Sequence, residues 1–328
     1  DHVIVHEWGH YFEDVFSRSD SIGGAHGTGD RLDMRLAFGE GWATALSGIA
    51  LDNDTYCDTR AMRQASGFRI GIENNSYGPD GWFSEFSILQ IIYDLWDQDI
   101  DGADTGSIGF APIYEAMTGA QKKTPAHTSI FSFADAVKAL TPAGAPLVDA
   151  LLAAEGINGT GIYGDGETND STNGSPDDVL PVYTDITPNG MNVNICSNRQ
   201  FDGDFSGNKL SEYRFLRMTI TIPSRYEFSI LTDDATVAQL PPDDLSDEHD
   251  QSDPDIRFYL DGAIQNRVVE GAPQGLSGEA NREYFVTPNV LAAGDYVMDL
   301  VEFRHTDPDS DASFPSRSCF DVMINPAP

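Results

Sequence analysis

Apolar residues in the first half of the chain recur three to four positions apart. This spacing places them on one face of a helix, and it predicts helices at 2–16, 33–51, 82–96, 129–140 and 145–154. Glycine-rich turns separate these segments. We therefore expect residues 1–160 to form a mainly helical domain.

Further along the chain the period changes to two. Apolar Leu216, Met218, Ile220 and Ile222 alternate with Arg217, Thr219 and Thr221, as expected for a strand with one buried face. Similar patterns predict strands at 226–230, 256–260, 282–287, 295–303 and 318–324. Several short strands with turns between them indicate an antiparallel β-sandwich over residues 191–328.

The segment between the two patterns is rich in Gly, Asn, Asp, Ser and Thr, which is typical of a linker, and we place this linker at 161–190. The expected fold is therefore a multidomain α+β fold, with a helical subdomain followed by the β-sandwich.

The composition is strongly acidic, with 53 Asp and Glu residues against 19 Lys and Arg residues and a formal net charge of -34. Phosphates would be repelled, so nucleic acid is excluded as a partner. No stretch approaches the roughly 20 apolar residues of a membrane span. Such a surface suits salt-rich or calcium-containing water or a soluble extracellular protein, and we expect a secreted or cell-surface location.

Three cysteines allow one disulfide. Cys196 and Cys319 lie at the two ends of the C-terminal segment, where a bridge would join a first strand to a last one, as secreted domains often do. Cys57 would then remain free.

The strongest chemical signal is His6-Glu7-Trp8-Gly9-His10, an H-E-x-x-H motif within an apolar helical stretch. Residues four apart share a helix face, so both imidazoles can bind one metal ion while Glu7 faces a bound water. Zinc lowers the pKa of that water towards ~7, and Glu7 can act as the general base.

A third ligand is predicted at Glu40, in the middle of a second apolar helical stretch. A buried carboxylate must be paired or metal-bound, because an isolated charge there is costly. Two histidines and one glutamate leave the fourth zinc position open for water, as a catalytic site requires. A structural site would more often be closed and cysteine-rich.

The runs HEWGHYFE and AFGEGWATALSGI resemble the thermolysin-like zinc peptidases with a glutamate ligand, the gluzincins, and most of all the fungalysins. The run GWFSE followed by ILQIIYDLW is similar to the fungalysin helix that carries GEVW. The resemblance covers residues 1–155. It implies a zinc-dependent endopeptidase that acts on proteins or peptides.

Three departures from the fungalysin pattern stand out. Gly81 occupies the position of the histidine that stabilises the oxyanion, so another donor is needed, with Tyr77 and Tyr93 as candidates or as packing residues. Thr44 replaces the aspartate that would orient a ligand histidine, so another carboxylate or a carbonyl is expected to substitute. The β-sheet that precedes the zinc helix in thermolysin-like enzymes is absent, so a cleaved upstream segment of the same protein is a possible partner, or else the chain is a half-cleft.

Two further features have competing interpretations. The run Asp97–Asp104 has the alternating carboxylates and glycine of a calcium loop, but Ile108 stands where an EF-hand has its bidentate glutamate, and a solvated acidic turn is the alternative. His26 lies between the two ligand segments and could overlook the cleft, although a histidine in a glycine-rich loop is more often structural or exposed.

The C-terminal segment, residues 196–326, resembles the prepeptidase C-terminal domain of bacterial secreted proteases, which implies an accessory module. The whole chain is thus interpreted as a secreted zinc endopeptidase. The alternative is a non-catalytic surface or binding protein that has kept a metallopeptidase scaffold.

Overall fold

The computed structural model describes residues 1–60, 62–74, 76–100, 102–169, 179–199, 207–240, 251–260, 267–270, 281–306 and 314–328. The chain divides into two compact units, Asp1–Glu167 and Thr168–Pro328. We call them the helical unit and the β unit. Of the predicted linker at 161–190, residues 170–178 lie outside the described residues.

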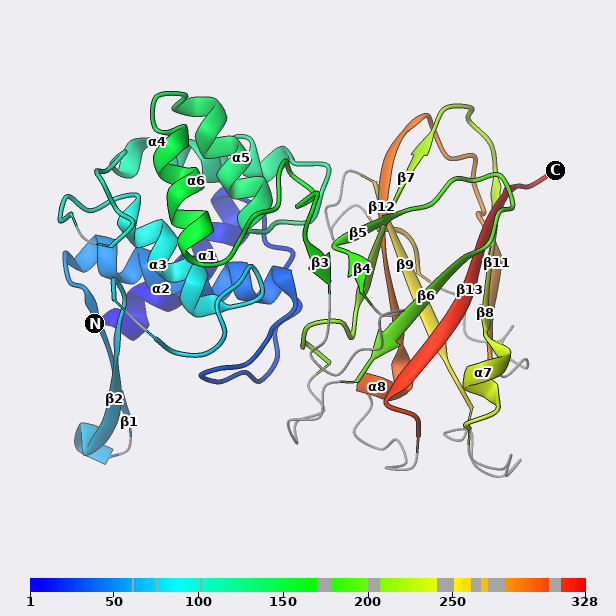
Figure 1. Ribbon diagram of the computed structural model, residues 1–328, viewed down its shortest axis with the longest axis horizontal. Helices are drawn as coiled ribbons and strands as arrows, with labels where there is room; N and C mark the ends of the chain where they lie inside the picture. The colour runs from blue at the N-terminus through cyan, green and yellow to red at the C-terminus, as the bar shows by residue number, and fades with distance from the viewer. Residues whose placement is uncertain are drawn as a thin grey trace. The chain divides into compact units, whose positions relative to one another are not determined.

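The helical unit contains six α-helices and two short 3-10 helices within its described residues (Figure 1). They are α1 (His2–Phe16), α2 (Met34–Leu51), α3 (Glu85–Asp94), α4 (Phe110–Thr118), α5 (Ile130–Leu140), α6 (Ala145–Ala154), η1 (Met62–Gln64) and η2 (Gln121–Lys123). Five of the α-helices confirm the predicted ones, although α3 is shorter than expected. Helix α4 was not predicted.

Helix α2 is the centre of this unit. Every residue from Met34 to Ile49 is buried except Glu40, which is partly exposed. A helix that is apolar on all sides belongs in a core, where it needs defined ends. The Asp33 side chain accepts a hydrogen bond from the Arg35 backbone N–H at the start, and Asp52 in the left-handed conformation ends the helix.

Two glycines allow neighbouring helices to approach α2 closely. A Cβ on Gly9 of α1 would lie 2.8 Å from the Cα of Ala43, and a Cβ on Gly41 would lie 2.6 Å from a side-chain methyl of Ile88 in α3. The indole N–H of Trp42 donates a hydrogen bond to the carbonyl oxygen of Gly9. These contacts bring α1 and α3 to opposite sides of the segment that carries Glu40.

The helical unit also contains an antiparallel hairpin of β1 (Thr55–Arg60) and β2 (Ser66–Gly71), which was not predicted. Most of the described β2 side chains are exposed, so no alternation of buried and exposed residues marks the strand. Figure 1 shows the hairpin projecting away from the helices of this unit.

The β unit is built from two sheets with strand orders β10-β9-β12-β7-β5 and β11-β8-β13-β6, together with the short pair β3-β4. Its strands are β3 (Thr168–Asn169), β4 (Leu180–Pro181), β5 (Tyr183–Asp185), β6 (Val193–Asn198), β7 (Arg214–Ile220), β8 (Tyr226–Thr232), β9 (Pro254–Leu260), β10 (Arg267–Glu270), β11 (Arg282–Val286), β12 (Gly294–Glu302) and β13 (Arg317–Pro326). Two short helices, α7 (Asp234–Val237) and α8 (Phe303–Thr306), complete the described elements.

Each predicted segment contains a strand, although the bounds differ by a few residues. The described strands pair antiparallel with one exception. Strand β5 pairs parallel to β7. The intervening strand β6 lies in the other sheet, so the chain returns to the first sheet in the same direction. The expectation of a purely antiparallel arrangement was therefore wrong at this edge.

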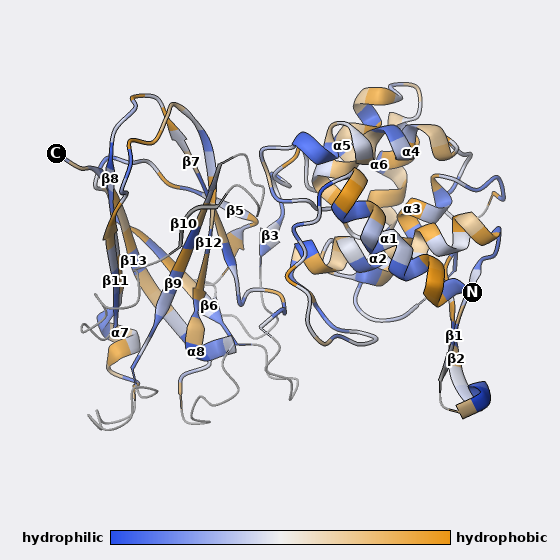
Figure 2. Cartoon of the chain, turned by 180° about the vertical axis from the view of Figure 1, so that it is seen from behind, coloured by the Kyte–Doolittle hydropathy of each residue, from blue (hydrophilic) through white to orange (hydrophobic). Residues whose placement is uncertain are grey.

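Both sheets contribute to a single hydrophobic core. Ile195, Phe228 and Phe320 come from one sheet, and Leu216 and Phe258 from the other. Burial alternates along β8 and along β7 from Leu216 to Ile220, as the period of two predicts. The predicted continuation to Ile222 was wrong, because β7 ends at Ile220 and Ile222 is exposed. Hydrophobic segments, orange in Figure 2, occur on strands of both sheets.

A disulfide joins Cys196 of β6 to Cys319 of β13, which are directly opposite each other in the pairing register. The predicted bridge is confirmed. Cys57 in β1 is a free thiol. Within the described parts of the chain, no helix has the length and apolar character needed to cross a membrane.

Candidate metal centre

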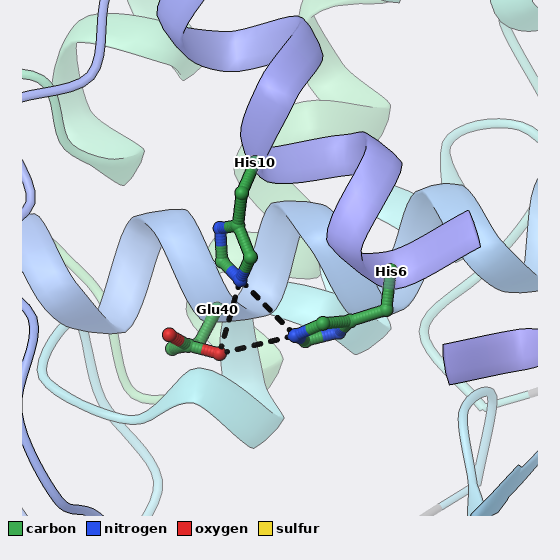
Figure 3. A group of neighbouring side chains, drawn as sticks. All are labelled: His6, His10 and Glu40. Atoms are coloured by element: carbon green, nitrogen blue, oxygen red, sulfur yellow. Dashed lines mark hydrogen bonds and ion pairs between the residues drawn. The ribbon is translucent and has the colours of Figure 1, made fainter. Parts of the chain in front are cut away.

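His6 and His10 project from one face of α1 and meet Glu40 of α2 (Figure 3). The two Nε2 atoms are 3.1 Å apart, and they lie 3.3 Å and 3.5 Å from the same oxygen, Oε2, of Glu40. The structure thus brings the three predicted ligands together, from positions four and thirty residues apart in the sequence.

This spacing fits a tetrahedral ion. Ligand atoms that are each about 2.0–2.1 Å from zinc at tetrahedral angles lie about 3.3–3.4 Å from one another. The three distances, 3.1–3.5 Å, bracket that value. Two imidazole nitrogens and a carboxylate oxygen are also a common donor set for catalytic zinc. The residues present therefore fit the predicted metal.

Thr44 contacts the first of the predicted ligands, His6. Its hydroxyl oxygen lies 3.0 Å from Nδ1 of His6. When Nδ1 donates to this hydroxyl, Nε2 carries the lone pair that a bound metal ion would need. The expectation that a carboxylate or a carbonyl would replace the missing aspartate was wrong, because the threonine at that position reaches the imidazole itself.

His26 approaches the other side of the Glu40 carboxylate. Its Nε2 lies 3.5 Å from Oε2 of Glu40 and 3.4 Å from Oε2 of Glu85, while Nδ1 lies 3.1 Å from the carbonyl oxygen of Gly24. The hydrogen bond to Glu40 raises the pKa of His26 to about 9 against the effect of burial. His26 is exposed, as the sequence favoured, and its ring nevertheless reaches both Glu40 and Glu85.

The electrostatics of the centre are dominated by Glu40. Burial would raise its pKa, but hydrogen bonds from His10, His26 and His6 outweigh burial and hold the pKa far below its usual range. Glu40 is therefore an anion surrounded by imidazoles. Burial lowers the pKa of His10, and its hydrogen bond to Glu40 more than reverses this, so that the net shift is upward.

The three ligands open onto a cavity of about 430 Å³. Its described lining consists of His6, Glu7, His10, His26, Glu40, Thr44, Tyr56, Phe68, Ile70 and Glu85. Glu7 is exposed on α1 and borders this space, as a base that acts on water in the cavity would need to. The hairpin provides an apolar wall with Phe68 and Ile70.

The two tyrosines named as oxyanion donors are not in this described lining. Tyr77 packs its ring against Phe86, with centroids 5.3 Å apart, and Tyr93 is buried against Trp96. Both are packing residues. Tyr56 of β1 lines the cavity instead, and burial together with nearby carboxylates raises its pKa to about 12, so that its hydroxyl remains a donor.

Two carboxylates of the run Asp97–Asp104 lie close to a third carboxylate from outside the run. Asp101 lies outside the described residues. Carboxylate oxygens of Asp97 and Asp99 lie within 4.8 Å of one from Glu73, which follows β2. The side chain of Asp104 accepts a hydrogen bond from the backbone N–H of Gly106. The sequence pattern identified part of this cluster and missed Glu73, which is distant along the chain.

No family model matches the chain, and no curated protein matches it. A solved structure, the pre-peptidase C-terminal domain of a collagenase from Bacillus anthracis, aligns with 44% of this chain and 94% of that chain. The sequence identity is 9% and the TM-score is 0.26, and at these values the likeness decides nothing about fold or function. The resemblance to gluzincins and fungalysins stays a prediction.

Proposed function

We propose that the chain is a secreted zinc endopeptidase, with the helical unit as its zincin-type catalytic subdomain and the β unit as an accessory β-sandwich. The observation that carries the proposal is the convergence of His6, His10 and Glu40 within 3.1–3.5 Å, beside a cavity that also exposes a further carboxylate. A structural ion would not require an open cavity with a free base beside it.

His6, His10 and Glu40 would hold the zinc ion, and Thr44 would fix the orientation of His6. When bound, zinc lowers the pKa of a water molecule towards ~7 and polarises the scissile carbonyl. Glu7 takes a proton from the attacking water and then delivers it to the leaving amine.

Negative charge develops on the carbonyl oxygen as water attacks, and donors aimed at this oxygen lower the barrier. The Tyr56 hydroxyl is the donor of the described lining that suits this task, whereas the ring nitrogens of His26 already face the Gly24 carbonyl oxygen and the Glu40 and Glu85 carboxylates. Glu85 accepts from His26 and so holds the ring in place. The apolar side chains of Phe68 and Ile70 form a surface on which a peptide can lie.

The test compares zinc content and proteolysis in the full chain and its variants. Zinc is measured by mass spectrometry, and hydrolysis is followed with a fluorescent casein. Glu7→Gln is expected to keep zinc and to lose activity by about a hundredfold or more. Glu40→Ala is expected to lose both.

Glu115→Gln is the matched control, because Glu115 is an exposed residue of α4 that does not line the described cavity. It is expected to leave zinc and activity unchanged. Equal casein degradation by the zinc-loaded unaltered chain and the zinc-loaded Glu7→Gln variant would refute the mechanism. Bound zinc without proteolysis in any of the proteins would favour the binding-protein alternative.

A further inference from the structure

A second group of carboxylates lies in the helical unit, at the base of the β1–β2 hairpin. Glu73 follows β2, while Asp97 and Asp99 follow α3. One oxygen of each lies within 4.8 Å of the others. None of these residues is in the described lining of the cavity beside Glu40. The cluster is therefore separate from the proposed catalytic site.

The environment of Asp97 is a second observation, besides the acidic cluster, that favours a bound cation. Its side chain is 8% exposed, and its Oδ1 is buried without a hydrogen-bond partner among the described residues. A buried carboxylate oxygen with no donor is costly unless a cation meets it. Burial raises the pKa of Asp97 to about 7, together with the charges of Glu73, Asp104 and Asp99 and a hydrogen bond between the Asp97 and Glu73 side chains.

We propose that Glu73, Asp97 and Asp99 bind a calcium ion that joins the hairpin to the end of α3. Three carboxylates supply hard oxygen ligands and negative charge, which suit calcium, and backbone carbonyls and water can complete its six to eight ligands. The graded exposure, from buried Asp97 through partly buried Glu73 to exposed Asp99, leaves a path from solvent.

Such an ion would fix the base of the hairpin. Ile72, next to Glu73, is fully buried, and its backbone N–H donates to the carbonyl oxygen of Asp54, just before β1. The start of β1 and the end of β2 would therefore both lie beside the ion. The same hairpin places Tyr56 and Phe68 in the catalytic cavity, so calcium would stabilise that wall.

Terbium provides a direct probe, because it replaces calcium and its emission is sensitised by nearby aromatic rings. Trp96 immediately precedes Asp97 in the sequence. The zinc-loaded full chain is titrated with terbium, with excitation of tryptophan, and the bound terbium is then displaced with calcium. Glu73→Gln and Asp97→Asn are each expected to lower the affinity for terbium about tenfold or more, because affinity follows the number of charged ligands. Glu115→Gln is expected to match the unaltered chain.

Equal terbium affinity in all four proteins would overturn the proposal. Displacement by magnesium as readily as by calcium would overturn the choice of calcium. These outcomes are independent of proteolysis, so failure of the calcium site and failure of the proposed function can be told apart.

Thermal unfolding distinguishes a ligand from a merely structural residue. In calcium-free buffer Asp97→Asn is expected to unfold at the same temperature as the unaltered chain or higher, because the change removes a buried repelling charge. Calcium is expected to raise the unfolding temperature of the unaltered chain and not of the variant. A variant that is less stable without calcium and responds to calcium normally would show that Asp97 is structural.

Discussion

Both units of this protein contain histidine and glutamate side chains that are partly or fully buried, but their polar atoms face different surroundings. In the helical unit, His6, His10 and Glu40 turn these atoms toward one another beside an open cavity. In the β unit, Glu302 and His305 are fully buried. Their atoms meet hydrogen-bond partners from the surrounding chain.

Glu302 accepts hydrogen bonds from the Ser252 hydroxyl and from the backbone N–H groups of Asp253 and Arg304. The ring nitrogens of His305 lie 3.0 Å from the Ser197 hydroxyl and 3.0 Å from the Pro315 carbonyl oxygen. Burial lowers the pKa of His305 to about 3, so the ring is neutral. The polar atoms of Glu302 and His305 thus form hydrogen bonds within the β unit and, among its described residues, do not face a cavity that a ligand could enter.

The comparison shows that residue type alone does not distinguish a candidate metal site from a structural cluster. What distinguishes them is whether the polar atoms have protein partners or face a space that a ligand can enter. The predictions that follow test this distinction, first in the β unit and then in the helical unit.

The largest effect is expected where the β unit depends on a covalent link. Replacing both Cys196 and Cys319 with alanine should destabilise this unit by about 2–5 kcal/mol, because the bridge closes a long loop in the unfolded chain. Urea unfolding followed by peptide-resolved hydrogen exchange measures the change for each unit. Zinc content should stay unchanged, and Cys57→Ala should affect neither property. Loss of zinc in the double variant would contradict the independence of the two units.

Glu302 should make the stability of the β unit depend on pH. Burial raises its pKa from 4.5 to about 7 despite the hydrogen bonds that it accepts. The folded state therefore binds more protons than the unfolded state between these values. Its contribution to stability is fully present below pH 4.5 and is lost as the pH rises through 7.

Glu302→Gln removes this loss and keeps one acceptor. Between pH 4.5 and pH 7 the free energy of unfolding of the variant should rise by up to about 3 kcal/mol relative to that of the unaltered chain. The same unfolding measurement, repeated across this range, checks the prediction. A difference that is constant with pH would mean that Glu302 is ionised in the folded protein throughout.

In the helical unit, the Thr44 hydroxyl should matter through the metal and not through packing. Thr44→Val keeps the shape of the side chain and removes the partner of His6 Nδ1. Zinc affinity, measured by competition with a chromogenic chelator, should fall about 10–100-fold. Thr44→Ser should retain most of the affinity. Equal affinity in the valine variant would show that the hydroxyl does not orient the ligand.

The smallest effect is expected at the contact between α1 and α2. Gly9→Ala would place a Cβ 2.8 Å from the Cα of Ala43 and push the two helices apart. Overpacking costs about 1–3 kcal/mol, and the better helix propensity of alanine returns part of this. We expect a net loss of about 1–2 kcal/mol in the helical unit, together with weaker zinc binding. A more stable variant would show that the helices have room to separate.

Several features of this protein follow from the sequence because they depend on local periodicity or on spacing along one element. Helix α1, the strands β7 and β8, and the disulfide were predicted correctly. The placement of His6 and His10 on one face of α1 follows from their spacing of four residues. The buried position of α2 similarly follows from its nearly continuous apolar character.

Other features required the tertiary structure, because they join segments through contacts that no periodicity encodes. The loop between α1 and α2 brings His26 to Glu40, and an unpredicted hairpin brings Tyr56 to the same cavity. Glu73 meets Asp97 because Ile72, which follows β2, and Tyr93 of α3 both pack against Gly48 of α2. Secondary structure is largely a local property of the chain, whereas the surroundings of a polar atom are decided by how distant segments pack. The sequence therefore predicted which residues could bind a metal ion, and the tertiary structure decided that they meet and what surrounds them.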